Sequence, residues 1–86
     1  MNHHATDSFW RAYNALPPAV QQLADRAFDL LKANPGHPSL HFKKIGRFRS
    51  ARVGAHYRAL AVQQDETLIW FWIGHHGDYD RIVKSV

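Results

Sequence analysis

A run of apolar residues from Leu68 to Ile73 constrains the fold of this chain more than any other feature of its sequence. Aromatic and β-branched side chains dominate the run, and Asp65-Glu66 and Gly74 bound it, which is the pattern of a strand buried on both faces. The sequence then changes abruptly to Gly74-His75-His76-Gly77-Asp78-Tyr79-Asp80-Arg81. A rigid strand that ends in ionisable side chains can hold reactive groups in fixed positions. We therefore expect a functional site at the end of this strand.

The composition allows one small folded domain. The chain has 86 residues and no cysteine, and 45% of its residues are hydrophobic. We expect a single domain over residues 1–86, with residues 1–6 disordered and the pair His3-His4 incidental. The lack of cysteine excludes disulfides and thiolate metal sites. No apolar run reaches the ~18 residues of a spanning helix and no secretory signal is visible, so we expect a cytoplasmic protein without a membrane anchor.

Positive charge is concentrated in the middle of the chain. The formal net charge is +4 with histidine neutral, yet no acidic residue occurs between Asp29 and Asp65. Such a block is typical of a surface that meets phosphates or an acidic protein, although a solvated face that only aids solubility has the same pattern. The cations of this interval are Lys32, Lys43, Lys44, Arg47, Arg49, Arg52 and Arg58.

Two helices are expected in the first half of the chain. Asp7 or Ser8 can cap a short helix from about Phe9 to Ala15. A second helix, opened by proline, should run from about Pro18 to Ala33, because its apolar residues recur at helical spacing and Asn34-Pro35-Gly36 ends it. The two helices would form a hairpin that buries one face.

Four strands are expected in the second half. Leu40–Ile45 alternates apolar and polar residues like an edge strand, Ala51–Gly54 and Tyr57–Gln63 read as a hairpin, and the apolar run that begins at Leu68 follows. The connections are too short for crossovers, so the strands should be antiparallel. The predicted fold is α+β, with the helical hairpin packed on a twisted antiparallel sheet of about four strands.

A register follows from the two turns. If the last hairpin turns about Asp65-Glu66, its pairs are Ala61 with Trp70, Ala59 with Trp72 and Arg58 with Ile73. The preceding hairpin, centred on Ala55, would place Arg52 opposite Arg58. Two guanidinium groups that face each other repel unless an anion or a carboxylate lies between them.

These residue types suit the cleavage of RNA. Attack of a 2′-hydroxyl on the adjacent phosphate needs a base, an acid and cations that stabilise the phosphate. Imidazole can act as either acid or base near neutral pH, guanidinium matches phosphate oxygens, and a phenol can stack on a base or donate a proton. The scheme needs no metal and no cofactor. The candidate catalytic residues are Arg58, His75, His76 and Tyr79, and the candidate RNA-binding residues are Lys43, Lys44, Arg47, Arg49, Arg52 and Arg81.

Each candidate also has a purely structural interpretation. The histidines could be turn residues, and Tyr79 could close the core with its hydroxyl outward. Asp80 and Arg81 could form a local ion pair or begin a short terminal helix. A zinc site is not expected, because His75 and His76 are adjacent and adjacent histidines rarely chelate one ion without further fixed ligands.

Three segments together resemble the RelE/ParE superfamily of bacterial toxins, most closely its RelE-like and HigB-like branch. The segments are Leu40–Lys44, Arg52–Leu60 and Trp70–Asp80, of which the last contains the family's Gly-x-His-x-x-Tyr-Asp ending. The resemblance implies an α+β toxin of a type II toxin–antitoxin pair that cleaves messenger RNA in the ribosomal A site. It also implies a cognate acidic antitoxin that wraps the toxin and blocks its site.

The resemblance assigns roles residue by residue. The family's strand arginine corresponds to Arg58, its early basic residue to Lys43 or Lys44, and the residues after its last strand to His75 or His76 and Tyr79. The chain departs from the RelE type, which has a basic run after the last strand and a tyrosine nearer its end. Two alternatives stay open: a ParE-like inhibitor of DNA gyrase without catalysis, and a non-toxic module that binds RNA or protein.

Overall fold

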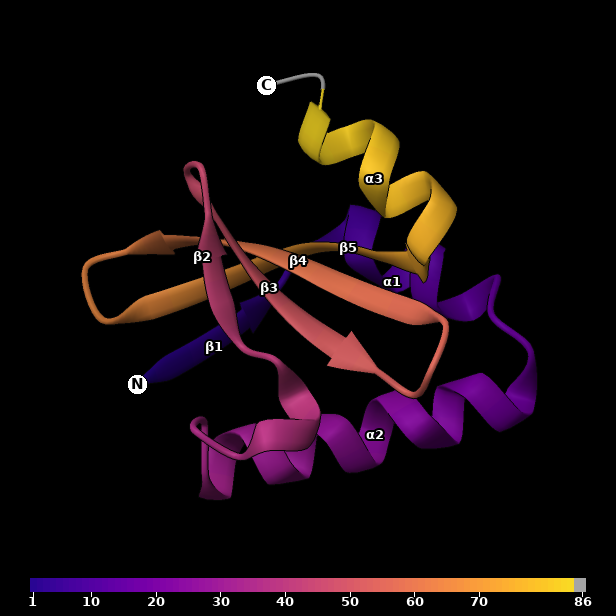
Figure 1. The fold of residues 1–86 in the computed structure, drawn as a ribbon, viewed down its shortest axis with the longest axis horizontal. Helices are drawn as coiled ribbons and strands as arrows, with labels where there is room; N and C mark the ends of the chain where they lie inside the picture. The colour runs from indigo at the N-terminus through magenta and orange to yellow at the C-terminus, as the bar shows by residue number, and fades with distance from the viewer. Residues whose placement is uncertain (85–86) are drawn as a thin grey trace.

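The computed structural model describes residues 1–84, and these form three α-helices and a five-stranded sheet (Figure 1). None of the helices in this range is long and apolar enough to cross a membrane. In chain order the elements are β1 (Asn2–Ala5), α1 (Asp7–Asn14), α2 (Pro18–Ala33), the 3₁₀ turn η1 (Pro38–Leu40), β2 (Lys43–Ile45), β3 (Phe48–Val53), β4 (Tyr57–Gln64), β5 (Thr67–His75) and α3 (His76–Lys84).

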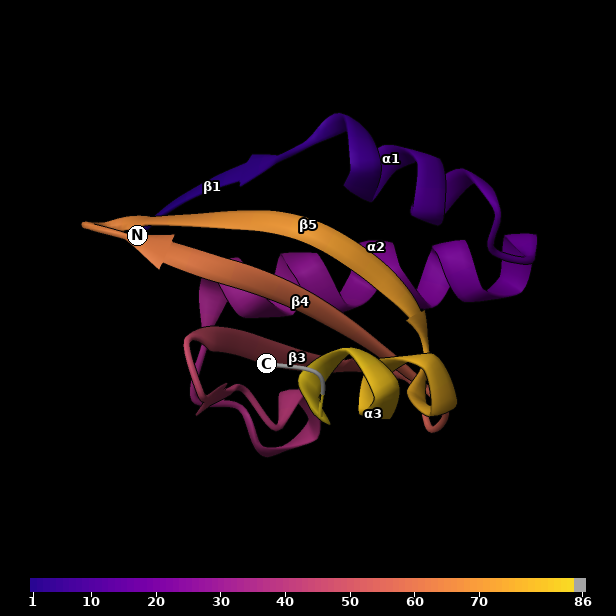
Figure 2. The ribbon, with the colours of Figure 1, turned by 90° about the horizontal axis from the view of Figure 1, so that it is seen from above.

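The sheet has the strand order β1-β5-β4-β3-β2. Strand β1 runs parallel to β5, and the other neighbouring pairs are antiparallel, as the short connections require. The helices are divided between the two faces. Figure 2 shows α1 and α3 on opposite sides of the strands, and α2 shares the side of α1.

Alternation along β4 builds one apolar layer on each face of the sheet. Ala59 and Ala61 point toward α1 and α2 and join a core that includes Trp70 and Ile73. Leu60, which is 0% exposed, points the other way and packs with Phe48 of β3 and Tyr79 of α3. The prediction of a last strand buried on both faces is confirmed in the same way, because Trp70 and Trp72 belong to different layers.

The two N-terminal helices have the predicted positions. The cap of α1 is Thr6, whose hydroxyl accepts a hydrogen bond from the Phe9 amide at 3.2 Å. The helix therefore begins at Asp7, before the predicted start at Phe9, and neither Asp7 nor Ser8 is its cap. Side chains join the hairpin: the Tyr13 hydroxyl donates to Asp25 Oδ1 at 2.8 Å, and the Gln21 amide donates to the Tyr13 carbonyl at 3.0 Å.

The prediction that residues 1–6 are disordered is wrong. Asn2–Ala5 forms the edge strand β1, and the amide of Asn2 donates to the Glu66 carbonyl at 2.8 Å. The indole Nε1–H of Trp70 donates to His3 Nδ1 at 3.1 Å, so His3 is part of the packing and not incidental. The sheet therefore has five strands in a mixed arrangement, where four antiparallel strands were expected.

Two further boundaries differ from the prediction. Leu40 lies in η1 and His41 has a positive φ of 43°, so the edge strand begins only at Lys43. The terminal helix, which was one of two interpretations of Asp80 and Arg81, is present as α3 but begins already at His76, directly after β5. In α3, Arg81 forms its ion pair with Asp78, one turn earlier, and not with Asp80.

The predicted register holds in two places and slips by one residue in a third. Ala61 pairs with Trp70, and Arg52 pairs with Arg58, as expected. A bulge at Leu60/Ala61 then shifts the pairing, so Ala59 lies opposite Ile73 and Arg58 opposite Gly74. A bulge adds one residue to one strand and bends it locally, which no alternation pattern reveals.

Candidate functional site

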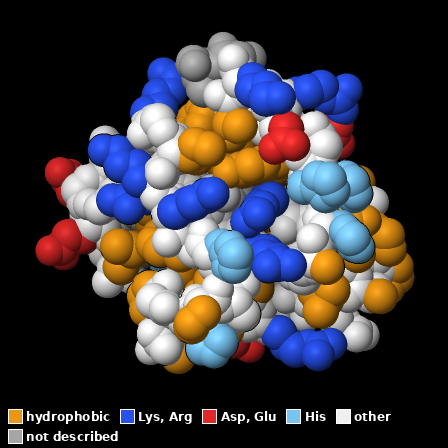
Figure 3. All heavy atoms as spheres, in the orientation of Figure 1, with side chains coloured by type: hydrophobic (Ala, Val, Ile, Leu, Met, Phe, Trp, Pro, Cys, Tyr) orange, Lys and Arg blue, Asp and Glu red, His pale blue; other side chains and the backbone are white. Residues whose placement is uncertain are grey.

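A group of cations lies on the face of the sheet that carries α3. Residues that pair across strands share a face, so Arg52 and Arg58 point to the same side as Leu60 of the α3 layer. Lys43 of β2, opposite Ser50 of β3, points to this side as well. Figure 3 views this face and shows lysine and arginine side chains gathered near its centre.

The Arg52–Arg58 pair has no anionic partner among residues 1–84. Neither guanidinium forms an ion pair with a carboxylate of residues 1–84, although the Nε–H of Arg52 donates to the Gly54 carbonyl at 3.0 Å. Like charges directly opposite each other on a sheet are destabilising. An anion between the two guanidinium groups would remove that repulsion, and a phosphate matches their planar geometry.

Three buried polar atoms on this face also lack a hydrogen-bond partner within residues 1–84: Ser50 Oγ, Arg58 Nη1 and Tyr79 Oη. The guanidinium carbon of Arg58 lies 5.6 Å from the centre of the Tyr79 ring, a cation–π contact that holds Arg58 against α3. Tyr79 is only 6% exposed, so it closes the core as its structural interpretation proposed, but its hydroxyl is buried and does not point outward.

A third histidine, which sequence reasoning missed, lies beside the two predicted ones. His75 ends β5 and His76 begins α3, and their ring centroids lie 4.4 Å apart. His56, from the turn before β4, lies 6.3 Å from the ring of His75 and 6.2 Å from that of His76. We call His56, His75 and His76 the histidine cluster.

Backbone contacts fix this cluster at one end of the sheet. The amide of His76 donates to the His56 carbonyl at 2.8 Å, and His75 pairs with Tyr57 across β4 and β5. The Nδ1 atom of His75 accepts from the Gly77 amide at 3.2 Å, which leaves Nε2 free of that contact. His56 could have been found from its position beside the Ala55 turn, because the pairing of β4 with β5 brings the start of β4 close to the end of β5.

The structure divides the candidate residues into subsets. Arg58 and Tyr79 are in contact, and the histidines form the cluster, but within residues 1–84 no hydrogen bond or ring contact joins Arg58 to a histidine. The two groups are nevertheless neighbours along the chain, because Gly74, the partner of Arg58, immediately precedes His75.

The candidate RNA-binding residues are likewise divided. Lys44 pairs with Arg49, which pairs with Ala61, so both cations point to the side of α1 and α2. Arg47 lies in the turn between β2 and β3, and Arg81 is exposed on α3 next to Asp78. Of the six candidates, Lys43 and Arg52 share the face of Arg58.

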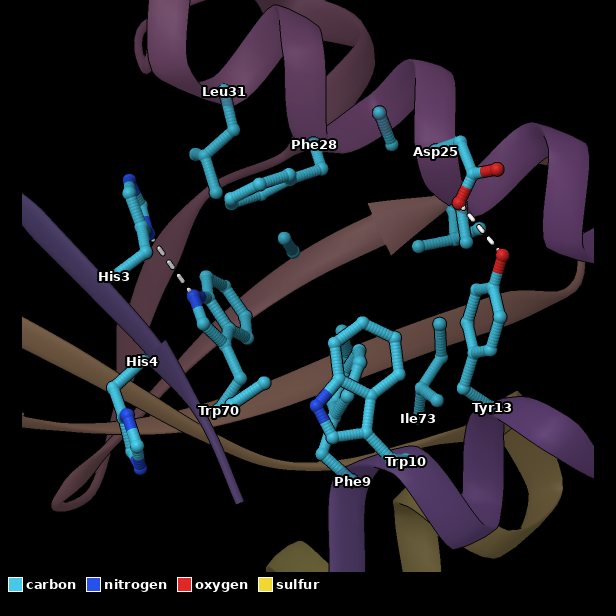
Figure 4. Close-up of a pocket in the computed structure, with 16 residues that line it drawn as sticks. His3, His4, Phe9, Trp10, Tyr13, Asp25, Phe28, Leu31, Trp70 and Ile73 are labelled. Carbon is cyan, nitrogen blue, oxygen red and sulfur yellow. Dashed lines mark hydrogen bonds between the residues drawn. The ribbon is translucent and has the colours of Figure 1, made fainter. Parts of the chain in front are cut away.

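An apolar cavity of about 270 Å³ lies elsewhere, between α1, α2 and the sheet (Figure 4). Aromatic side chains of both helices and of Trp70 line it, and it contains none of the candidate site residues. Burial, followed by the charges of the N-terminal ammonium and Lys32, lowers the pKa of His3 at this cavity. The hydrogen bond to Asp25 raises the pKa of Tyr13.

No protein-family model matches the sequence, and no curated protein matches it significantly. Solved structures do match. A chain of the RelB–RelE antitoxin–toxin complex from Methanococcus jannaschii aligns with a TM-score of 0.71 and 18% identity, over 91% of this chain and 96% of that one. The isolated RelE toxin of E. coli aligns with a TM-score of 0.63 and 12% identity, over 98% of this chain and 96% of that one.

This chain has the RelE fold. A chain of the RelBE2 toxin–antitoxin complex from Mycobacterium tuberculosis agrees, with a TM-score of 0.63 and 24% identity, over 86% of this chain and 95% of that one. The resemblance drawn from short sequence segments is thus confirmed at the level of the fold. In the RelE fold of this chain, Arg58 lies on the central strand β4 and the histidine cluster lies where β5 passes into α3.

Proposed function

We propose that this chain is the toxin of a bacterial type II toxin–antitoxin pair and that it cleaves messenger RNA on the ribosome, in the cytoplasm. The observation that supports this most is the Arg52–Arg58 pair, which has no carboxylate partner in residues 1–84 and lies beside three histidines on a RelE fold. Guanidinium groups and imidazoles are the side chains that a metal-independent cleavage of RNA requires.

The proposed reaction is an attack by the ribose 2′-oxygen on the adjacent phosphorus. His75 or His76 removes the 2′-hydroxyl proton as the O–P bond forms. The bond from phosphorus to the 5′-oxygen breaks, and that oxygen takes a proton from the other histidine, which leaves a 2′,3′-cyclic phosphate and a 5′-hydroxyl. Arg58 stabilises the negative charge on the phosphate in the transition state.

The geometry suggests supporting roles for the neighbours of Arg58. The ring of Tyr79, 5.6 Å from the guanidinium carbon, would position Arg58 and not take part in proton transfer, since its hydroxyl is buried. Arg52 and Lys43 would bind phosphate oxygens on the same face, while Lys44, Arg47, Arg49 and Arg81 would attract the RNA electrostatically.

The proposal includes a protein partner. Chains of the same fold from Methanococcus jannaschii and E. coli were solved as complexes of RelE with the antitoxin RelB. For this chain, with a net charge of +4, we propose a cognate acidic antitoxin, because complementary charge speeds association.

Induced expression tests the function. We expect growth arrest, with new 5′ ends of messenger RNA inside codons. The Arg58→Ala variant should cleave ribosome-bound messenger RNA on the order of 100- to 1000-fold more slowly, as for loss of one group that stabilises transition-state charge. The matched control is Arg11→Ala, an exposed arginine on α1. Intact messenger RNA with a DNA-damage response would identify a gyrase inhibitor instead, and normal growth would indicate a non-toxic binding module.

A further inference from the structure

The histidine cluster is an exposed group of three rings, in which His56 and His75 are stacked and the other two pairs are tilted. The planes of His56 and His75 differ by 15°, and those of His75 and His76 by 31°. Tyr57 closes one side, with its ring 5.6 Å from that of His75 at 83°. All three histidines are exposed, so the array is not part of the core.

Other roles for three grouped imidazoles find less support. A metal site needs ring nitrogens that converge on one point, and no such group of ligands exists among residues 1–84. A catalytic dyad oriented by a carboxylate is not formed either, because no acidic side chain of that range lies within ion-pair distance of the cluster. The exposed faces of these rings are a further feature, which the proton transfers proposed above do not use.

We propose that the histidine cluster is a stacking platform for an unpaired base of single-stranded RNA, with His56 as a binding residue. This inference rests on the proposed function and specifies the RNA that the site accepts. Proteins bind single-stranded RNA by stacking splayed bases on aromatic side chains, histidine included. A base within a duplex is already stacked on its neighbours and has no free face to offer.

The platform and the phosphate site are placed to hold one nucleotide. Gly74 pairs with Arg58, and His75, the next residue, pairs with Tyr57, so the cluster lies at the end of the sheet next to the arginine pair although His75 alternates to the other face. The face that carries Arg58 also shows histidine side chains beside its lysines and arginines (Figure 3). A nucleotide whose base stacks on the cluster would extend past this end of the sheet, with its adjoining phosphate toward the arginine pair.

The backbone that carries the platform is also held in place before RNA arrives. The backbone bond from His76 to His56 and the pairing of Tyr57 with His75 fix all three backbones relative to one another. A fixed backbone limits the positions that the three rings can take, so less entropy is lost on binding, which improves affinity. His56 lies outside the sequence motif that contains His75 and His76, but these backbone contacts hold it next to them.

A binding assay with a non-cleavable probe tests the platform separately from the reaction. The probe is a 2′-O-methyl single-stranded oligonucleotide that carries one 2-aminopurine, whose fluorescence falls when it stacks on an aromatic ring. We expect the wild-type protein to bind this oligonucleotide and quench its fluorescence, and not to bind the same oligonucleotide in a duplex. His56→Ala should weaken binding by about 5- to 100-fold and remove its share of the quenching, and His56→Phe should restore both.

The control is His4→Ala, an exposed histidine on β1, which should bind like the wild type. Circular dichroism confirms that each variant is folded. Equal binding and quenching by folded His56→Ala would overturn the platform, even if the protein cleaves messenger RNA. Failure of folded His56→Phe to restore binding would also overturn it. Conversely, quenching that depends on His56 in a protein that neither arrests growth nor cleaves RNA would support the platform and refute the proposed toxin activity.

Discussion

The hydrogen bond between His3 and Trp70 makes a specific prediction about the first strand. The indole N–H of Trp70, a residue only 5% exposed, donates to His3 Nδ1 at 3.1 Å, which requires the ring proton of His3 to be on Nε2. Replacing His3 with phenylalanine keeps an aromatic ring near Phe28 but removes the acceptor. A buried donor left without a partner costs about 1–3 kcal/mol. For a domain of this size each kcal/mol lowers Tm by about 4–8 °C.

The same bond makes stability depend on pH. Burial, and then the charges of the N-terminal ammonium and Lys32, lower the pKa of His3 in the folded protein below its usual value of 6.5. The unfolded chain therefore binds the proton more readily, so stability rises with pH in this range. The contribution of His3 is complete above pH 6.5 and is lost as the pH falls through its lowered folded pKa.

Urea denaturation at pH 7.5 and again at pH 5 measures both effects. We expect His3→Phe to lose stability at pH 7.5 and to show a smaller further loss on acidification than the wild type. His4→Phe, at the neighbouring exposed position of the same strand, controls for strand propensity. Equal midpoints of wild type and His3→Phe at pH 7.5, together with equal acid sensitivity, would refute the reasoning.

Three further predictions concern the α3 face. Leu60→Ala, at a fully buried position of β4, should destabilise the protein by about 2–5 kcal/mol in urea denaturation, and a smaller loss would mean that the layer collapses around the gap. Gly74→Ala should cost about 1–3 kcal/mol, since a β-carbon there would lie 2.5 Å from Trp72 Cζ2; an unchanged Tm would contradict this. Arg52→Gln should reduce the slope of log affinity against log salt for single-stranded RNA by about 0.7, measured by fluorescence anisotropy, and an unchanged slope would show that Arg52 contacts no phosphate.

The parts of the fold that could be predicted are those with strong local patterns. Helix α2 has a regular apolar stripe between two proline-containing boundaries, and its predicted span of Pro18–Ala33 is confirmed. The tight turn near Ala55 was enough to predict the pairing of Arg52 with Arg58, and the turn at Asp65-Glu66 that of Ala61 with Trp70. Periodicity and turn chemistry are encoded within a few residues, so one sequence suffices to read them.

The parts that were missed depend on distant contacts. Strand β1 is too short and polar to show alternation, and it is ordered by its bonds to β5. Helix α3 contains Gly77 and Asp78, which are poor helix formers, and its formation depends on burial of Tyr79 against the sheet. The bulge at Leu60/Ala61 is likewise a property of the assembled sheet.

The candidate site shows the same division. Residue type and position identified Arg58 and the two histidines where β5 passes into α3, whose catalytic roles stay predictions. His56 was missed because its proximity to them arises only when β4 and β5 pair. The division of the basic block between two faces was also hidden, because it follows from the pairing of Lys43 with Ser50 and of Lys44 with Arg49, which no turn in the sequence specified.

The place of Arg58 on β4 has a consequence for how the protein would fail. Strand β4 is hydrogen-bonded on both edges and covered on both faces, so its amide hydrogens should be among the last to exchange with solvent. A guanidinium anchored there cannot be released by fraying of a terminus or a loop. Heating should then abolish phosphate binding and secondary structure in one transition, at a common midpoint.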